Sequence, residues 1–180
     1  VCMPNIEGMI VDLATRLPLG PGQTGEMWIR GPLAMKGYLK DPATTAATKD
    51  SDGWIHTGDI GYADEDGYFY VIDRLKELIK YKAYQVAPAE LEAVLLSHPA
   101  VADVAVVRSP DEEAGEVPKA FVVLKATATE DELMGYVAER VAPYKKVRRV
   151  EFIDAIPKSA TGKLLRRVIR RELADRFDEA

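Results

Sequence analysis

The sequence predicts an α+β protein in two parts, a β-rich segment over residues 1–72 and a mixed α+β domain over residues 73–180. In the first part, short apolar runs alternate with glycine, proline and aspartate residues typical of turns. In the second part, continuous apolar runs typical of buried strands alternate with runs of helical periodicity. The apolar fraction of 47% is that of a globular protein, and no apolar run approaches the roughly 20 residues that cross a bilayer.

Turn-forming residues delimit the strands expected in the first part. The pair Asp66-Gly67 between two apolar runs is typical of a β-hairpin. Asp41 followed by Pro42 predicts a short helix over residues 41–48. The strands are expected at residues 8–13, 25–30, 54–62 and 68–72. They have too few apolar positions for a comfortable core, so we expect the edge of a barrel or sheet system.

The second part is expected to contain a three-stranded sheet, helices and a β-hairpin. Pro88 can open a helix that places Leu91 and Leu95 on one face. Thr129 followed by Glu132 is a capping-box sequence that predicts the start of the next helix. The strands are expected at residues 104–107, 120–124 and 150–153, the hairpin at 75–79 and 84–86, and the last helix at 163–177.

Cysteine and histidine usage restricts the chemistry. Cys2 is the only cysteine, which excludes an intramolecular disulfide and a cysteine zinc cluster and fits a cytoplasmic location. His56 and His98 lie far apart without the spacing of metal ligands, so we expect no metal site on histidine.

The net charge of −5 conceals a basic segment near the end of the chain. Residues 143–171 contain ten lysines and arginines against two acids, a net charge of +8. Such a segment is a candidate site for an anion, whether a nucleic acid, a membrane surface or a nucleotide. Few aromatic residues interleave with its arginines and no recognition motif is present, so we do not expect nucleic-acid binding.

The residues next to Asp59 and Lys163 in the sequence make these two side chains candidates for binding or catalysis. Asp59 follows Thr57 and Gly58 at an expected turn, where a carboxylate can accept hydrogen bonds from a ribose diol, although such a turn also serves geometry alone. Lys163 stands at the start of an expected helix, where a lysine is unfavourable unless an anion is bound. The bland alternative is a solvated lysine.

Five motifs in order resemble those of the adenylate-forming superfamily, which contains acyl-CoA synthetases, firefly luciferase and the adenylation domains of peptide synthetases. The sequence of residues 79–82 followed by residues 85–90 looks most like that of the 4-coumarate–CoA ligase and luciferase branch. The motifs are Gly37-Tyr-Leu39, Gly53-Trp-Ile-His-Thr-Gly-Asp59, Asp73-Arg-Leu-Lys-Glu-Leu-Ile-Lys-Tyr-Lys82, Tyr84-Gln-Val-Ala-Pro-Ala-Glu-Leu-Glu92 and Pro157-Lys-Ser-Ala-Thr-Gly-Lys163.

The resemblance implies a small mobile carboxy-terminal domain that presents two faces in turn to one active site. The hinge then corresponds to Asp73, and Asp59 and Arg74 to the residues that hold the ribose of the nucleotide. Lys163 corresponds to the lysine of the adenylation step. Lys80, a second catalytic residue, and Gln85 correspond to groups near AMP in the thioester-forming arrangement. The CoA-binding candidates are Lys82, Ala83 and Tyr84.

The resemblance also implies the substrates and the missing parts. Residues 1–72 then correspond to the last, β-barrel-like subdomain of a large amino-terminal domain. We expect a carboxylic acid, ATP, CoA and magnesium, with the metal held mainly by the rest of that large domain. No phosphate-binding loop of the family occurs in these 180 residues, so we expect the chain alone to be inactive. Ala83 stands where relatives commonly have glycine, so an acceptor other than CoA stays open. A non-catalytic binding module using the basic segment is a further alternative, and Lys163 is a candidate target of a lysine acetyltransferase.

Overall fold

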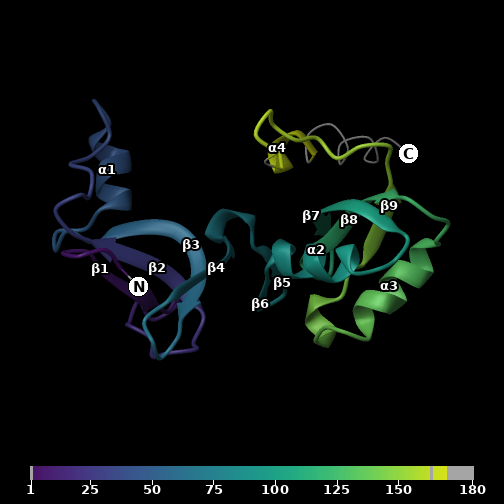
Figure 1. Ribbon diagram of the computed structural model, residues 1–180, viewed down its shortest axis with the longest axis horizontal. Helices are drawn as coiled ribbons and strands as arrows, with labels where there is room; N and C mark the ends of the chain where they lie inside the picture. Colours follow the sequence, from purple (N-terminus) through teal and green to yellow (C-terminus); the bar gives the residue numbers. More distant parts are fainter. Residues whose placement is uncertain (1, 163, 170–180) are drawn as a thin grey trace. The chain divides into compact units, whose positions relative to one another are not determined.

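The computed structural model describes residues 2–162 and 164–169, except for the side chain of Arg167. The described chain divides into two compact units, Val1–Lys76 and Glu77–Ala180 (Figure 1). The sequence predicts a boundary between residues 72 and 73, whereas Asp73 and Arg74 of the structure still pair with a strand of the first unit.

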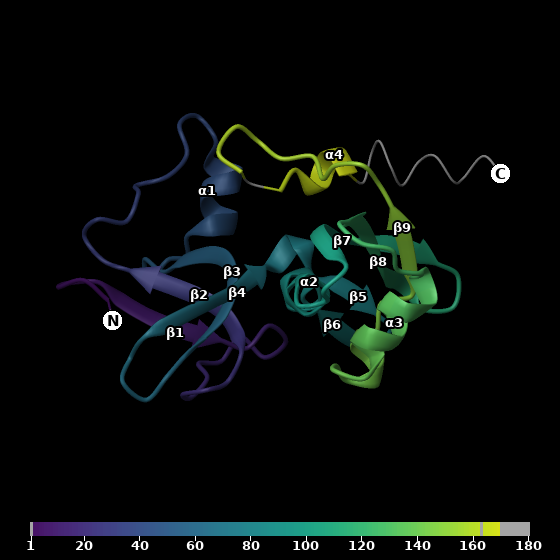
Figure 2. The same ribbon diagram turned by 45° about the vertical axis from the view of Figure 1, so that its right-hand side comes forward.

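The first unit is an antiparallel meander of four strands in the order β1-β2-β3-β4 (Figures 1 and 2). The predicted helix is present as α1 (Pro42–Thr48), and the Asp41 side chain accepts a hydrogen bond of 2.9 Å from the N–H of Thr44. The turn with Asp66 and Gly67 joins the last two strands, as predicted. The strands are β1 (Glu7–Val11), β2 (Gly25–Arg30), β3 (Ile55–Ala63) and β4 (Phe69–Arg74).

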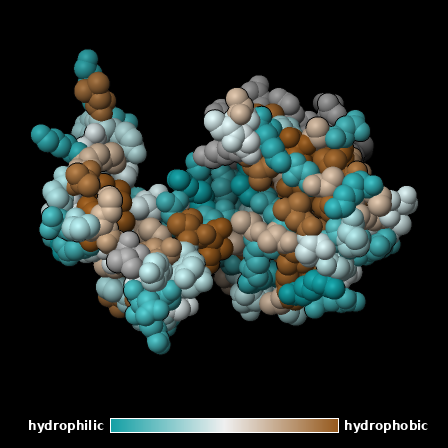
Figure 3. Space-filling model, in the orientation of Figure 1, coloured by the Kyte–Doolittle hydropathy of each residue, from teal (hydrophilic) through white to brown (hydrophobic). Residues whose placement is uncertain are grey.

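The first unit has a small apolar core. Its buried apolar side chains are Ile10, Val11, Trp28 and Ile60. Apolar side chains also reach the surface (Figure 3), and in this unit the exposed ones include Leu33, Leu39 and Val71. A sheet with so few buried apolar residues fits the prediction of an edge of a larger system.

The second unit contains the three-stranded sheet and the hairpin that the sequence predicts. Strands β7 and β8 form a long antiparallel pair, and β9 runs parallel to β8 along its other edge. A parallel pair needs a crossover connection, which here contains helix α3 (Glu130–Ala138). Hairpin β5-β6 joins β8 through one pair, Tyr81 with Gly115. The strands are β5 (Ile79–Tyr81), β6 (Tyr84–Val86), β7 (Val101–Asp111), β8 (Gly115–Leu124) and β9 (Arg149–Phe152).

Apolar side chains cover both faces of this sheet, because successive strand residues point to opposite sides. Helices α2 (Pro88–Leu96) and α3 (Glu130–Ala138) pack on one face, where the core includes Leu91, Leu133, Val104 and Val122. The other face buries Phe121 and Val107 beneath the chain around Ile156 and Ile169 (Figures 1 and 2). The capping box at Thr129 is present as predicted, with the Glu132 N–H donating to the threonine hydroxyl.

Two predicted elements begin later than the sequence indicates. Residues Leu75–Glu77 form a 3₁₀ turn, so the hairpin strand starts at Ile79 instead of residue 75. Within the described residues, the last helix is α4 (Arg166–Ile169) and does not start at residue 163. The N–H of Leu165 donates to the carbonyl of Pro157, which holds this stretch in a loop. The part of the predicted helix over residues 170–177 lies outside the described residues.

Candidate nucleotide-binding site

The structure brings Asp59 and Arg74 together on neighbouring strands of the first unit. They are direct partners in the register of β3 and β4, and Arg74 Nε lies 2.6 Å from Asp59 Oδ1. The Asp59 side chain is 23% exposed and that of Arg74 is 55% exposed. The carboxylate is therefore partly sheltered but still reachable, and the guanidinium has further donors to offer a ligand.

Asp59 lies within a strand, and the prediction that it sits at a turn is wrong. Residues 57–59 of β3 lie opposite one residue of β2, Met27, in an irregular bulge between two regular pairs. Gly58 has a φ of 69°, a left-handed value that glycine adopts at little cost. A β-carbon there would meet nothing within 4 Å, so the torsion, not crowding, favours glycine. Bulges re-aim side chains, and this one presents Asp59.

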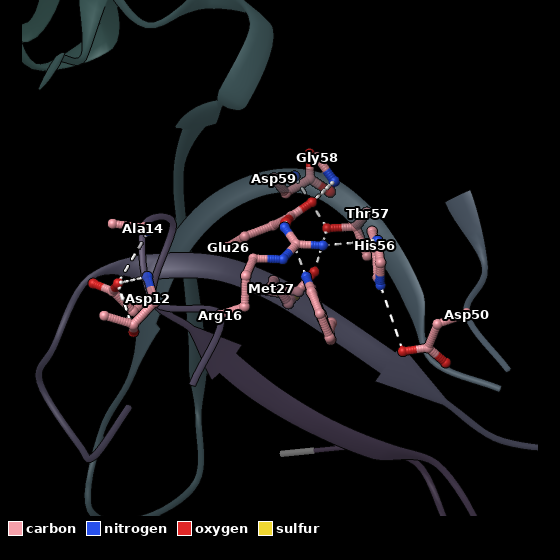
Figure 4. Close-up of polar contacts among 12 residues, drawn as sticks. Asp12, Ala14, Arg16, Glu26, Met27, Asp50, His56, Thr57, Gly58 and Asp59 are labelled. Atoms are coloured by element: carbon pink, nitrogen blue, oxygen red, sulfur yellow. Dashed lines mark hydrogen bonds and ion pairs between the residues drawn. The ribbon is translucent and has the colours of Figure 1, made fainter. Parts of the chain in front are cut away.

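Side chains on both strands hold the bulge in place. The Thr57 hydroxyl donates to the carbonyl of Met27 at 2.7 Å and accepts the Asp59 N–H at 3.0 Å. The Gly58 N–H donates to Glu26 Oε1 at 3.1 Å (Figure 4). Glu26 is not among the residues predicted from the sequence. The available signal was its position two residues before Trp28 on one strand, which places a carboxylate on the face of a large apolar side chain.

Asp73, the predicted hinge, lies in β4 as the partner of Ile60. It is 9% exposed, and its Oδ1 accepts the N–H of Arg74 at 2.7 Å. The register between β3 and β4 shifts beside this pair, so Ile72 is an extra residue between the partners of Ile60 and Gly61. The division between the two compact units follows Lys76.

In the second unit, Lys80 and Gln85 are opposite partners in the β5-β6 hairpin. Both are exposed, and opposite partners share one face of a hairpin. The Lys80 N–H donates to Glu116 Oε2 at 2.8 Å, which ties the hairpin to β8. The structure therefore brings these two predicted residues together.

The hairpin turn contains the CoA-binding candidates. Lys82 has a φ of 53°, and its ammonium lies 2.6 Å from Glu113 Oε1. The hydrogen bond to Glu113 raises the pKa of Lys82 above its ordinary value. The φ of Ala83 is not positive, so its backbone conformation does not require the glycine that relatives commonly have there. Tyr84 stacks on Tyr144 with ring centroids 4.4 Å apart.

Lys163 lies outside the described residues, but the loop on either side of it is described. The N–H of Gly162 donates to the carbonyl of Ser159 at 2.9 Å, and Gly162 has a φ of 79°. Lys158 pairs with Asp103 of β7 and forms a backbone bridge with Leu164. Local hydrogen bonds therefore hold Gly162 and Leu164 on either side of the predicted catalytic lysine, and the Lys158–Asp103 ion pair ties this loop to β7.

No group of three or more histidine, cysteine, aspartate or glutamate residues suited to a metal ion occurs in the described part of the chain. His56 instead stacks on Trp28 at 3.8 Å, and His98 Nδ1 accepts the N–H of Ala100. Residues 2–162 and 164–169 also include no helix long and apolar enough to cross a membrane.

A family model and a solved structure identify the class of protein to which this chain is similar. Residues 90–163 match the AMP-binding enzyme C-terminal domain. ATP-bound MatB from Rhodopseudomonas palustris has a similar structure, with a TM-score of 0.90 and 30% sequence identity over 97% of this chain and 35% of that one. The fold is thus that of the carboxy-terminal part of an adenylate-forming enzyme, as predicted.

Proteins similar in sequence are named as CoA ligases or ligase-like proteins. A protein of Oryza sativa subsp. japonica named 4-coumarate–CoA ligase-like 6 is 63% identical over 91% of this chain and 28% of its own length. The peroxisomal OPC-8:0-CoA ligase 1 of Arabidopsis thaliana is 54% identical over 91% of this chain and 30% of its own length. The chain is homologous to the carboxy-terminal part of 4-coumarate–CoA ligases and ligase-like proteins. It spans about 30% of the length of these relatives.

Proposed function

We propose that this chain is the carboxy-terminal part of an ATP-dependent carboxylic acid–CoA ligase, which forms an acyl-AMP and then transfers the acyl group to CoA. The observation that carries the proposal is the Asp59–Arg74 pair. It is a partly exposed carboxylate and guanidinium on a chain homologous to CoA ligases. The substrates are then ATP, a carboxylic acid and CoA.

In this proposal the first unit holds the nucleotide sugar. The carboxylate of Asp59 accepts hydrogen bonds from the two ribose hydroxyls, and Arg74 pairs with that carboxylate and contacts the sugar. Holding the adenylate between the two half-reactions is an orientation effect, because the intermediate must stay in place until the acceptor arrives.

The adenylation step needs a positive charge where the acid's carboxylate meets the α-phosphate. Lys163 is the proposed source of that charge, since its ammonium can stabilise the negative charge that concentrates on the oxygens between them. Acetylation of Lys163 would remove this charge. The described residues contain no cluster of three or more acidic, histidine or cysteine side chains suited to magnesium.

The second step uses another face of the carboxy-terminal domain. Lys80 and Gln85 would then approach the adenylate, and the turn at residues 82–84 would line the path of CoA. We propose that residues 73–180 rotate about Asp73 against residues 1–72, because two half-reactions at one site need different groups in turn.

The identity of the acid and the location are narrower proposals. The relatives' names suggest an aromatic or a fatty acid as substrate. The single cysteine favours a cytoplasmic location, although one relative is named as peroxisomal.

The decisive test uses the full-length protein that contains this chain. Pyrophosphate release with ATP is measured over a panel of aromatic and fatty acids, and the acyl-CoA product is then measured with the best acid. We expect both activities, and we expect Asp59→Ala to weaken both through poorer ATP binding. Pyrophosphate release without acyl-CoA would indicate another acceptor, and the absence of acid-dependent pyrophosphate release would refute the proposal.

A further inference from the structure

Glu26 is a buried carboxylate beneath the bulge that presents Asp59. It is 3% exposed and lies on β2, an internal strand of the sheet that pairs with β1 on one side and with β3 on the other. An ionised group in such a place is costly unless donors satisfy its oxygens. Figure 4 shows Gly58 and Arg16, which both donate to this carboxylate.

Both carboxylate oxygens of Glu26 are acceptors. Oε1 accepts the backbone N–H of Gly58 at 3.1 Å, inside the bulge. Oε2 accepts the indole N–H of Trp28 at 2.8 Å and a longer contact of 3.4 Å from the guanidinium of Arg16. One side chain therefore links the bulge of β3 to a fixed aromatic ring on β2.

A strained loop delivers Arg16 to this place. Arg16 has a φ of 61°, and the side chain of Asp12 holds the loop by accepting the N–H of Ala14 and of Thr15. The guanidinium lies 4.6 Å from the centre of the Trp28 ring. Arg16 therefore reaches Glu26 from a left-handed backbone position, which costs free energy in a non-glycine residue.

We propose that Glu26 is a positioning residue of the nucleotide site, which fixes the direction of Asp59 by holding the N–H of Gly58. The inference rests on the proposed role of Asp59 in binding ribose. It adds a residue that contacts neither nucleotide nor acid in the proposal and acts only through the bulge.

The geometry makes glutamine a sharp substitute at this position. Glutamine has nearly the shape of glutamate but carries one oxygen and one NH₂ group. Two donors, from Trp28 and Arg16, face Oε2, so the amide oxygen should take that side, which turns the NH₂ group toward the N–H of Gly58. Glu26→Gln should therefore shift the bulge without removing bulk, and Asp59 should move with it.

The experiment measures recognition of the ribose hydroxyls by the full-length protein. The preference is the ratio of kcat/KM for ATP to kcat/KM for 2′-deoxy-ATP and for 3′-deoxy-ATP, measured by pyrophosphate release. We expect Glu26→Gln to lower this preference roughly tenfold, because a small misplacement of a binding group costs one to two orders of magnitude. Melting temperature is followed in parallel.

Two other variants calibrate the result. Asp59→Asn should remove most of the preference, and if it does not, the proposed nucleotide site itself fails. Glu7→Gln is the matched control, because Glu7 pairs with Arg30 at 2.7 Å on the same sheet but is 61% exposed and distant in register from the bulge. It should leave the preference unchanged.

A milder variant covers the case in which Glu26→Gln does not fold. Trp28→Phe keeps an aromatic ring beside His56 and removes one donor from Oε2. We expect a smaller fall in the preference, roughly twofold to fivefold. Wild-type preference in every folded variant of Glu26 and Trp28, alongside its loss in Asp59→Asn, would show that Glu26 supports only the fold and would overturn the inference.

Discussion

Arg74 lies directly opposite Asp59, and the 2.6 Å contact between its Nε and the carboxylate is set by irregular registers on both sides of β3. On one side the bulge at residues 57–59 turns the aspartate, and on the other the extra residue Ile72 adjusts β4. The pair is thus fixed by backbone geometry as well as by charge.

The first prediction concerns the fork geometry of Arg74. Arg74→Lys keeps the charge but loses Nε and the planar set of donors, which a lysine ammonium cannot replace. We expect KM for ATP to rise roughly tenfold with a smaller change in kcat, and Arg74→Ala to be worse. Steady-state kinetics of the full-length protein measure this. The control is Arg30→Lys, which changes the partner of Glu7 on the same sheet; an equal effect there would remove Arg74 from the nucleotide site.

The second prediction concerns the two half-reactions at Lys163. Lys163→Ala should slow adenylation by roughly 10²–10³, the scale for losing one preorganised charge-stabilising donor. Thioester formation from a supplied acyl-adenylate should change far less, because the proposed second step uses Lys80 and Gln85. The two steps are followed separately in single turnovers. Equal losses in both would contradict the assignment to two faces.

The third prediction is a stability change in the second unit. Thr129 caps α3, and its hydroxyl accepts the N–H of Glu132 at 3.2 Å. Thr129→Ala should lower the free energy of unfolding by about 1 kcal/mol, the usual effect of losing such a cap. Urea unfolding of the 180-residue chain measures it. Thr127→Ala, two residues earlier and also exposed, is the control and should change the free energy by less than about 0.5 kcal/mol.

The fourth prediction is a pH effect at the β3-β4 turn. The N–H of Tyr68 and the hydroxyl of Tyr70 donate to Asp64, and the Tyr68 hydrogen bond is the main cause that lowers the pKa of Asp64 below its ordinary value of 3.8. A lowered folded-state pKa stabilises the fold above pH 3.8, and this stabilisation is lost as the pH falls through the folded value.

Asp64→Asn cannot ionise, so it should lose less stability than the wild type between about pH 5 and pH 3. The measurement is the midpoint of urea unfolding across this range. Asp66→Asn is the control, because Asp66 contributes its N–H to the same turn by donating to Asp64. If the Asp64 variant and the wild type lose stability in parallel, the turn does not depend on this charge.

Local signals predicted what local interactions determine. The capping box at Thr129, the helix after Asp41 and the turn at Gly67 depend on residues only a few positions apart, and each is present. Only the family motifs suggested that Asp59 and Arg74 serve the same nucleotide sugar; their pairing across β3 and β4 is a finding of the structure. The position of Asp59 in a bulged strand depends on the contact between Thr57 and Met27, which are thirty residues apart, and no nearby residue indicates that pairing.

The burial of Glu26 could not be predicted for the same reason. A glutamate in a strand is usually solvated, and only the pairing of β2 on both edges encloses this one. The last helix was predicted too early because the leucines at 164 and 165 fit helical periodicity. In the structure the Leu165 N–H bonds to Pro157, and the bridge from Leu164 to Lys158 closes a loop.

The last prediction concerns Asp73 as a hinge. Proline fixes φ near −65° and removes the amide donor, so Asp73→Pro should block any rotation that needs a change of torsion there. In the full-length protein we expect adenylation to continue near its normal rate while thioester formation fails. Single-turnover kinetics of each step measure this, with melting temperature as a check on folding.

The competing explanation is that Asp73 serves only to end a strand. Its carboxylate accepts the N–H of Arg74, so losing it could disturb the nucleotide site without any hinge. Asp73→Ala separates the two explanations, because it removes the carboxylate but leaves the torsions free. If the carboxylate alone matters, the alanine and proline variants should slow both steps alike. If rotation matters, only the proline variant should slow one step and leave the other near its normal rate. A fixed torsion holds the domain in one arrangement, so the catalytic groups of the other half-reaction cannot reach the site. Uniform slowing of both steps in a well-folded Asp73→Pro protein would therefore move the hinge elsewhere, with Lys76, at the division between the two units, as the next position to test.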